Sequence, residues 1–166
     1  METESNQLVQ LLKQKKLTLA LAESMTAGLA SYYLSEVNGT SEVFLGGIVC
    51  YNSNVKQDLL CVDADLIKKY SAESQEVTDE LAKKLATLIK ADVFAAITGL
   101  AGPGGSESEE KPVGTVFISV LFQNEIAAYR KHFKGTPSEI KKKGVSYLFR
   151  CVLEVLGRDG LGRFGE

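Results

Sequence analysis

The residues best suited to chemistry are two hydroxyls, Ser24 and Thr26, placed where an apolar run gives way to an amphipathic segment. The run LTLAL at 17–21 predicts a buried strand, and apolar residues at helical intervals predict a helix at 29–36. Backbone N–H groups at a helix start lack intrahelical partners, and the helix dipole adds partial positive charge there. Such a turn could bind an anion or hold a hydroxyl as a nucleophile. In the alternative interpretation, Ser24 or Thr26 only caps the helix.

A serine hydroxyl needs a base to become an effective nucleophile, and the sequence restricts which base is available. The single histidine, His132, falls in a predicted strand, two residues after Arg130 and on the same, solvent-facing side. A catalytic role is therefore not expected for it. A lysine can serve instead if burial or a nearby cation lowers its pKa toward neutrality. Lys56 and Lys111 are the two candidates, and Lys111 could alternatively be a cation for an anionic ligand. Both could equally be ordinary solvated lysines.

Composition excludes several other classes of site. Cys50, Cys61 and Cys151 are widely spaced with no CxxC pair, so we expect reduced thiols packed in the core. A single histidine excludes a zinc site with two histidine ligands, and no metal or organic cofactor is expected. The net charge of −2 opposes nucleic-acid binding, despite the short basic run at 141–143. No apolar stretch reaches the roughly 18–20 residues of a membrane helix, and the polar N-terminus does not read as a signal peptide, so we expect a cytoplasmic protein without a membrane partner.

The elements that must position these residues alternate between helices and strands. After a short helix at 5–15, buried strands are predicted at 17–22, 44–51 and 92–98, the last two covered on both faces. Further helices are predicted at 55–62, at 63–70, from Ser74 onward and at 138–156, and a hairpin joins strands 113–122 and 125–133. This order predicts one α/β domain at 1–157 with a mixed sheet, parallel in its centre and antiparallel at its edge, followed by a frayed tail at 158–166.

Three of the predicted strands end in turns at 24–26, 51–56 and 98–105. In open α/β sheets, ligands bind beyond the carboxyl ends of the strands. If the strands are parallel, one edge of the sheet collects a hydroxyl, a phenol, an amide, a lysine and a glycine-rich loop. That loop is neither a Walker A sequence nor GxGxxG, so by itself it is a weak signal.

Four motifs occur in order along the chain: AESxTxG at 22–28, YxxNxK at 51–56, TGxAGP at 98–103 and KPVGT at 111–115. With them the chain resembles the C-terminal domain of the CinA (competence/damage-inducible) family, which also occurs as a stand-alone nicotinamide mononucleotide deamidase. The resemblance implies a three-layer α/β/α fold and a serine amidohydrolase that converts nicotinamide mononucleotide to the acid and ammonia. Ser24 would be the nucleophile, Lys56 the base, and Tyr51 a third catalytic residue in the same polar cluster. The expected substrate-binding positions are Thr26, Gly28, Asn54, Thr98, Gly99, Ala101, Gly102 and Lys111.

Two positions depart from the pattern of that family. Ala27 stands where the family usually has glycine, and Pro137 stands where an arginine is usual. The absence of that arginine favours an alternative function, a non-catalytic nucleotide-binding or assembly domain that keeps the pocket without turnover. For either function we expect a small-molecule nucleotide partner, no nucleic acid, and a homo-oligomer.

Overall fold

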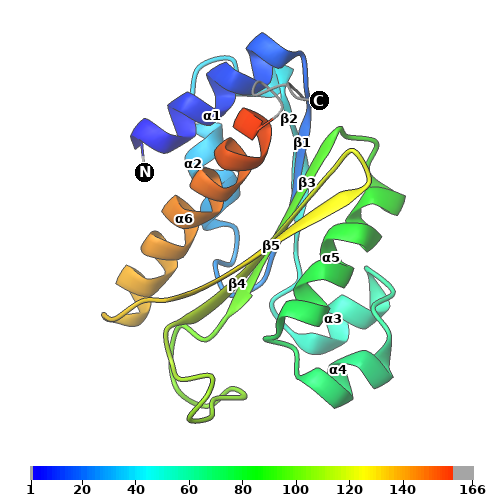
Figure 1. The fold of residues 1–166 in the computed structure, drawn as a ribbon, viewed down its shortest axis with the longest axis vertical. Helices are drawn as coiled ribbons and strands as arrows, with labels where there is room; N and C mark the ends of the chain where they lie inside the picture. The colour runs from blue at the N-terminus through cyan, green and yellow to red at the C-terminus, as the bar shows by residue number, and fades with distance from the viewer. Residues whose placement is uncertain (1, 159–166) are drawn as a thin grey trace, which may run out of the picture.

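The structure, a computed structural model, describes residues 2–158, and within them five strands form one mixed sheet in the order β2-β1-β3-β4-β5 (Figure 1). The strands are β1 (Leu19–Glu23), β2 (Phe44–Val49), β3 (Val93–Gly99), β4 (Thr115–Phe122) and β5 (Glu125–His132). β1 pairs in parallel with β2 and β3, whereas β4 pairs antiparallel with β3 and β5. The carboxyl ends of β1, β2 and β3 therefore meet at one edge of the sheet, as the sequence predicted.

Helices cover both faces of this sheet and give a three-layer α/β/α domain (Figure 1). One layer holds α1 (Glu2–Lys15), α2 (Leu29–Ser35) and α6 (Pro137–Arg158). The opposite layer holds α3 (Ser53–Asp58), α4 (Ala64–Tyr70) and α5 (Gln75–Leu88), and a short 3-10 helix, η1 (Thr40–Glu42), precedes β2. None of the helices within residues 2–158 combines the length and the apolar character needed to cross a membrane.

The two faces of the sheet pack against separate hydrophobic clusters, and the central strand β3 contributes side chains to both. Val93, Ala95 and Ile97 pack with the residues of the α1, α2 and α6 layer. Phe94 and Ala96 pack with the residues of the α5 layer. Because side chains alternate along a strand, every residue of β3 is buried, which confirms the interior strand predicted from its uncharged sequence.

The hairpin at the end of the sheet is also confirmed. Gln123 and Asn124 connect β4 to β5, and both adopt positive φ angles, 51° and 65°. Two successive left-handed residues are what a two-residue hairpin turn requires to match the twist of its strands. Ser74 begins α5 as predicted, because its hydroxyl accepts a hydrogen bond from the Val77 backbone N–H.

The strand predicted at 44–51 is shorter and more exposed than expected. β2 ends at Val49 and lies at the edge of the sheet, where Leu45 and Val49 are each 47% exposed. The prediction of a strand covered on both faces was therefore wrong, because an apolar run does not by itself distinguish an edge strand from an interior one. Its glycines do mark close backbone approach, since a Cβ on Gly47 would lie 2.7 Å from the carbonyl oxygen of Leu21.

Other boundaries shift by a few residues. The helix predicted at 55–62 is α3, which ends at Asp58, and α1 begins at Glu2 rather than at residue 5. Arg158, assigned to the tail, is the last residue of α6, and the remainder of the predicted tail lies outside the described residues.

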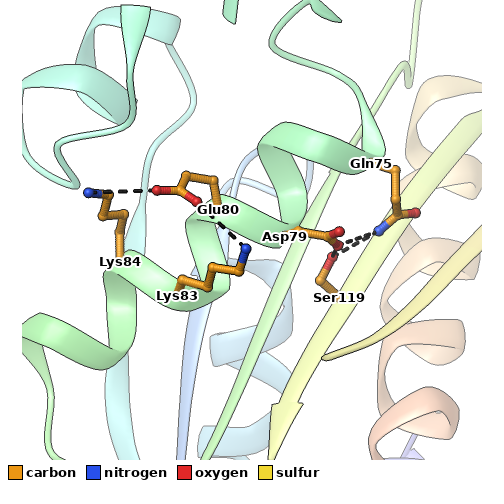
Figure 2. A network of polar contacts seen from close by, with 6 residues as sticks. All are labelled: Gln75, Asp79, Glu80, Lys83, Lys84 and Ser119. Atoms are coloured by element: carbon orange, nitrogen blue, oxygen red, sulfur yellow. Dashed lines mark hydrogen bonds and ion pairs between the residues drawn. The ribbon is translucent and has the colours of Figure 1, made fainter. Parts of the chain in front are cut away.

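A polar network on one face of the sheet fastens α5 to β4 (Figure 2). The Asp79 carboxylate accepts a hydrogen bond from the Ser119 hydroxyl at 2.5 Å and from the Gln75 side-chain amide at 2.9 Å. Farther along the helix, Glu80 forms ion pairs with Lys83 and Lys84 at 4.0 and 3.6 Å. The hydrogen bonds to Ser119 fix the position of the first turns of α5 along β4. They thereby also position the loop that precedes the helix.

Candidate active site

The turn between β1 and α2 holds Ser24 at the edge of the sheet. Ser24 is 5% exposed, and its backbone N–H donates to the carbonyl oxygen of Ile97 on β3. The chain then turns sharply, because Ala27 and Gly28 both adopt positive φ angles, 52° and 95°. These consecutive left-handed residues place α2 behind the serine, so the expected strand–turn–helix arrangement around Ser24 is present.

The side-chain carboxylate of Glu23 occupies the start of α2. Glu23, which is 1% exposed, accepts five hydrogen bonds. The donors are the Thr26 hydroxyl (2.7 Å), the backbone N–H groups of Gly28 (3.2 Å), Ala30 (3.0 Å) and Ser31 (2.8 Å), and the Ser31 hydroxyl (2.6 Å). The expectation of an open anion site at this helix start was therefore wrong, because Glu23 already satisfies these donors.

Lys56 lies beside Ser24 and is itself buried. Its Nζ is 3.0 Å from Ser24 Oγ and donates to the carbonyl oxygen of Cys50 at 2.7 Å, and the residue is 1% exposed. Burial lowers the pKa of Lys56, while Cys50 and Glu73 act in the opposite direction. No ion pair within residues 2–158 includes Lys56. Burial therefore shifts Lys56 in the direction of the neutral amine, and its Nζ is in contact with a serine hydroxyl.

A cavity of about 270 Å³ opens in front of Ser24. It is lined by Ser24, Met25, Tyr51, Glu73 and the loop at 99–105. Tyr51 is 62% exposed and stands at its mouth, where Lys141 Nζ lies 5.9 Å from the centre of the phenol ring.

Gly99 shapes the floor of this cavity. It has a φ of 155°, and a Cβ there would lie 2.5 Å from the Thr115 carbonyl oxygen and 2.6 Å from the Met25 sulfur. Only glycine fits this position without displacing its neighbours.

The structure brings together six of the residues predicted from the motifs. Ser24, Tyr51, Gly99, Ala101 and Gly102 line the cavity, and Lys56 contacts Ser24. Thr26 and Gly28 instead bond to Glu23, behind the serine. Their roles in substrate binding stay predictions.

The other three predicted residues lie away from the cavity. The Thr98 hydroxyl is fully buried, 2.7 Å from that of Thr78 on α5. Asn54 is exposed on α3, where its backbone N–H donates to the Asn52 side chain. Lys111 lines a neighbouring depression with Arg130. A direct contact of these three with substrate also stays a prediction.

The histidine and the cysteines lie outside the chemistry at Ser24. His132 is exposed on β5, with Nε2 3.0 Å from the Val113 carbonyl oxygen, as the solvent-facing alternation predicted. Cys50 is buried beside the Glu23 carbonyl oxygen, and burial raises the pKa of its thiol. Cys151 is buried as well, but Cys61 is exposed, which corrects its assignment to the core. Cys61 has a φ of 52° just after the turn that ends α3, a local geometry that apolar neighbours in the sequence did not reveal.

Two functional groups were missed in the sequence. The Cys50 carbonyl that accepts from Lys56 is a backbone atom, and no side-chain pattern identifies it. Glu73 lies in the loop before α5, far in sequence from every motif, and only the packing of that loop against the glycine-rich loop brings it to the cavity. No group of histidine, cysteine or acidic residues suited to a metal ion occurs in the described part of the chain.

Comparison with known proteins connects this geometry to one family. The CinA C-terminal domain family matches residues 1–156. A CinA-like protein of Thermotoga maritima is 43% identical over 136 residues, which are 82% of this chain and 33% of that relative. A putative competence-damage inducible protein of Bacillus subtilis is 37% identical over 144 residues, which are 87% of this chain and 34% of that relative. The chain thus spans about a third of the length of the curated relatives it matches.

Solved structures share the whole fold. A CinA superfamily protein from Klebsiella pneumoniae superposes with a TM-score of 0.90 at 27% identity, covering 95% of this chain and 98% of that one. One from Escherichia coli superposes with a TM-score of 0.88 at 29% identity, covering 93% and 89%.

Proposed function

The chain belongs to the CinA C-terminal domain family, and on that premise we propose that it is a serine amidohydrolase that converts nicotinamide mononucleotide to nicotinic acid mononucleotide and ammonia. The observation that carries the proposal is the 3.0 Å contact between the buried Lys56 amine and the Ser24 hydroxyl at the wall of a cavity. A buried lysine without an ion pair is costly to a fold, and this cost is explained if the neutral amine acts as a base.

The proposed reaction is acyl transfer in two steps. Lys56 takes the Ser24 proton while Ser24 Oγ forms a bond to the amide carbon. The C–N bond then breaks, and the proton held by Lys56 passes to the leaving nitrogen, which departs as ammonia. In the second step a water molecule gives a proton to Lys56 and attacks the acyl carbon, and the proton returns to Ser24 as the acid is released.

Backbone N–H groups are the candidates for stabilising the oxyanion of the tetrahedral intermediate. The N–H of Met25 follows the nucleophile directly and has no hydrogen-bond partner among the described residues. The N–H groups of Ala101 and Gly102, two residues that also line the cavity, likewise have no hydrogen-bond partner among the described residues. One such donor removed from an oxyanion hole costs about 10²–10³ in rate in other hydrolases.

The nucleotide would extend beyond the cavity. A volume of about 270 Å³ is smaller than the roughly 300–1,000 Å³ that encloses a drug-sized ligand, so the cavity suits the carboxamide and its ring, with the phosphate outside. Lys141, beside Tyr51 at the mouth, is the cation placed to meet that phosphate. The motifs favour Lys111 for this role, but its ammonium donates to Ser71, Glu73 and Ser106.

The test is ammonia release from nicotinamide mononucleotide by the purified protein and four variants. We expect turnover by wild type, and Lys56→Met should lower it by about 10²–10⁴, the usual contribution of a general base. Ser24→Ala should lower it at least as much, and the double variant should lose little more, because the two residues act as one unit. His132→Ala is the control and should keep wild-type turnover. Near-normal turnover by Lys56→Met would exclude the Ser–Lys mechanism.

One observation favours the alternative function, a nucleotide-binding or assembly domain without turnover. Pro137, in place of the usual arginine, begins α6 beside the glycine-rich loop, with its Cγ 3.8 Å from the position a Gly102 Cβ would occupy. An arginine at this point could reach the cavity, and proline cannot replace its charge. Nucleotide binding by wild type with no ammonia release would establish this alternative and exclude the amidohydrolase.

A further inference from the structure

Glu73 is the charged side chain that lines the cavity in front of Ser24. Among the described residues that form the cavity wall, the others are a serine, a tyrosine and apolar or glycine residues. Glu73 lies in the loop between α4 and α5 and is half-buried. The residues that line the cavity therefore include one carboxylate, which neither the proposed nucleophile nor the proposed base requires.

The carboxylate is held in place from behind. Ser106 Oγ donates to Glu73 Oε2 at 2.5 Å, and Lys111 Nζ donates to Ser106 Oγ at 2.7 Å and to the Glu73 carbonyl oxygen at 2.8 Å. No ion pair within residues 2–158 includes Glu73; the Lys111 ammonium acts on the Glu73 charge through the bridging Ser106 hydroxyl, and no cation contacts the carboxylate directly within these residues. A fixed, partly desolvated charge acts more strongly on a bound ligand than a solvated one.

We propose that Glu73 is a specificity-determining residue that selects amides carried on a positively charged aromatic ring, such as an N-substituted pyridinium, over amides on a neutral ring. The proposal rests on the proposed function, because it takes Ser24 as the group that meets the carboxamide. With the amide carbon at Ser24, the attached ring occupies the cavity that Glu73 lines. The Tyr51 ring at the mouth adds an aromatic face, which also attracts a flat cation.

A second effect of Glu73 must be separated from this one. Its negative charge raises the pKa of Lys56, against the effect of burial. Replacing Glu73 by glutamine would therefore shift the rise of activity with pH toward lower pH, and the shift would be the same for every substrate. Charge selection, in contrast, changes the preference between two substrates at a single pH.

The experiment measures binding, independently of turnover, in a Ser24→Ala background by titration calorimetry. The probes are nicotinamide mononucleotide and the corresponding neutral C-nucleoside monophosphate, in which a benzamide ring replaces the pyridinium. We expect tighter binding of the pyridinium nucleotide, and Glu73→Gln should weaken its binding about tenfold while changing that of the neutral nucleotide less than about twofold. Glu76→Gln is the matched control, because Glu76 is an exposed carboxylate of the same segment that does not line the cavity.

The proposal is overturned if Glu73→Gln weakens both nucleotides equally, if it weakens neither, or if neither nucleotide binds. Its fate is distinguishable from that of the proposed function, which is decided by ammonia release from the protein with Ser24 intact. A preference for the pyridinium that disappears in Glu73→Gln, in a protein that releases no ammonia, would support charge selection and exclude the amidohydrolase.

Discussion

At the scale of single residues, the lysine beside Ser24 links the activity of the site to the stability of the protein. Lys56 is buried and forms no ion pair with any residue between 2 and 158, and burial lowers its pKa. Between this lowered pKa and about 10.5, the unfolded chain binds a proton that the folded chain does not. Stability therefore rises with pH across that window, and the full destabilisation is present below the folded pKa.

We expect the unfolding free energy of wild type to rise with pH relative to that of Lys56→Met, by at most about 1.4 kcal/mol per pH unit. Urea unfolding of both proteins from pH 7 to pH 10 measures the difference, and the shared titration of all other groups cancels. If Lys56 is the base of the proposed amidohydrolase, kcat/KM should increase with pH around the same folded-state pKa, because the neutral amine is the form that accepts the serine proton. A difference that does not change with pH would mean that Lys56 titrates normally.

Ala27 is a second residue with a local cost, because it adopts a left-handed conformation with a φ of 52°. A residue with a Cβ loses about 1–2 kcal/mol there, and glycine avoids the loss but gains entropy in the unfolded chain. We expect Ala27→Gly to stabilise the protein by about 0.5–1 kcal/mol in urea unfolding.

The same substitution at Ala30 is the control. Ala30 is buried in the regular part of α2, so Ala30→Gly should destabilise by about 1 kcal/mol. If both substitutions destabilise equally, the left-handed conformation at residue 27 carries no cost.

The sequence predicted residues of the site unequally. Because the single histidine falls in a predicted solvent-facing row, the residues themselves left Lys56 and Lys111 as candidate bases, and the resemblance to the CinA family pointed to Lys56. The structure places the side chains of Ser24 and Lys56 in contact. Glu73 and the Cys50 carbonyl could not be predicted, because their place at the site depends on how separate loops pack.

At the scale of elements, the start of α2 depends on Glu23. Its carboxylate satisfies three backbone N–H groups and two hydroxyls in a buried place. Glutamine would keep one acceptor oxygen and direct an N–H₂ group at the same donors. We expect Glu23→Gln to destabilise the protein by about 2–4 kcal/mol, measured by urea unfolding.

Glu36, at the other end of α2, provides the comparison for Glu23. It is exposed, so Glu36→Gln should change the unfolding free energy by less than about 0.5 kcal/mol. Similar effects of the two substitutions would show that the buried carboxylate contributes nothing particular to the turn.

Element types were more predictable than element surroundings. Hydrophobic periodicity gave the helices and strands, and the Ser74 cap and the two-residue hairpin were confirmed. The exposure of β2 was not predicted correctly, because an apolar run in the sequence does not distinguish an edge strand from an interior strand. Likewise, an acidic residue at the end of a strand gave no sign that it would fill the helix start that follows it.

At the scale of the whole molecule, the two core clusters share the strand β3. Cavities made on opposite sides of the sheet should therefore lower the same unfolding transition. We expect Leu81→Ala, on the α5 side, to cost about 2–5 kcal/mol and Phe149→Ala, on the α6 side, about 3–5 kcal/mol.

The measurement for this pair is urea unfolding followed by near- and far-ultraviolet circular dichroism. In both variants the two signals should change together, with the slope of wild type, because all layers unfold as one unit. Separate transitions in either variant would show that the two faces of the sheet are independent.

The switch from parallel to antiparallel pairing at β3 has a consequence for how domains of this fold can vary in sequence. β3 ends at Gly99, β4 begins at Thr115, and the pairing of Gly99 with Val116 returns the chain to the edge it has just left. The segment 100–114 is therefore a loop whose two ends are held by paired strands. It can become longer or shorter, or change composition, while the strands keep their register. Ser24 and Lys56 lie outside it. Changes in this segment could thus alter one wall of the cavity and leave the contact between Ser24 and Lys56 unaltered.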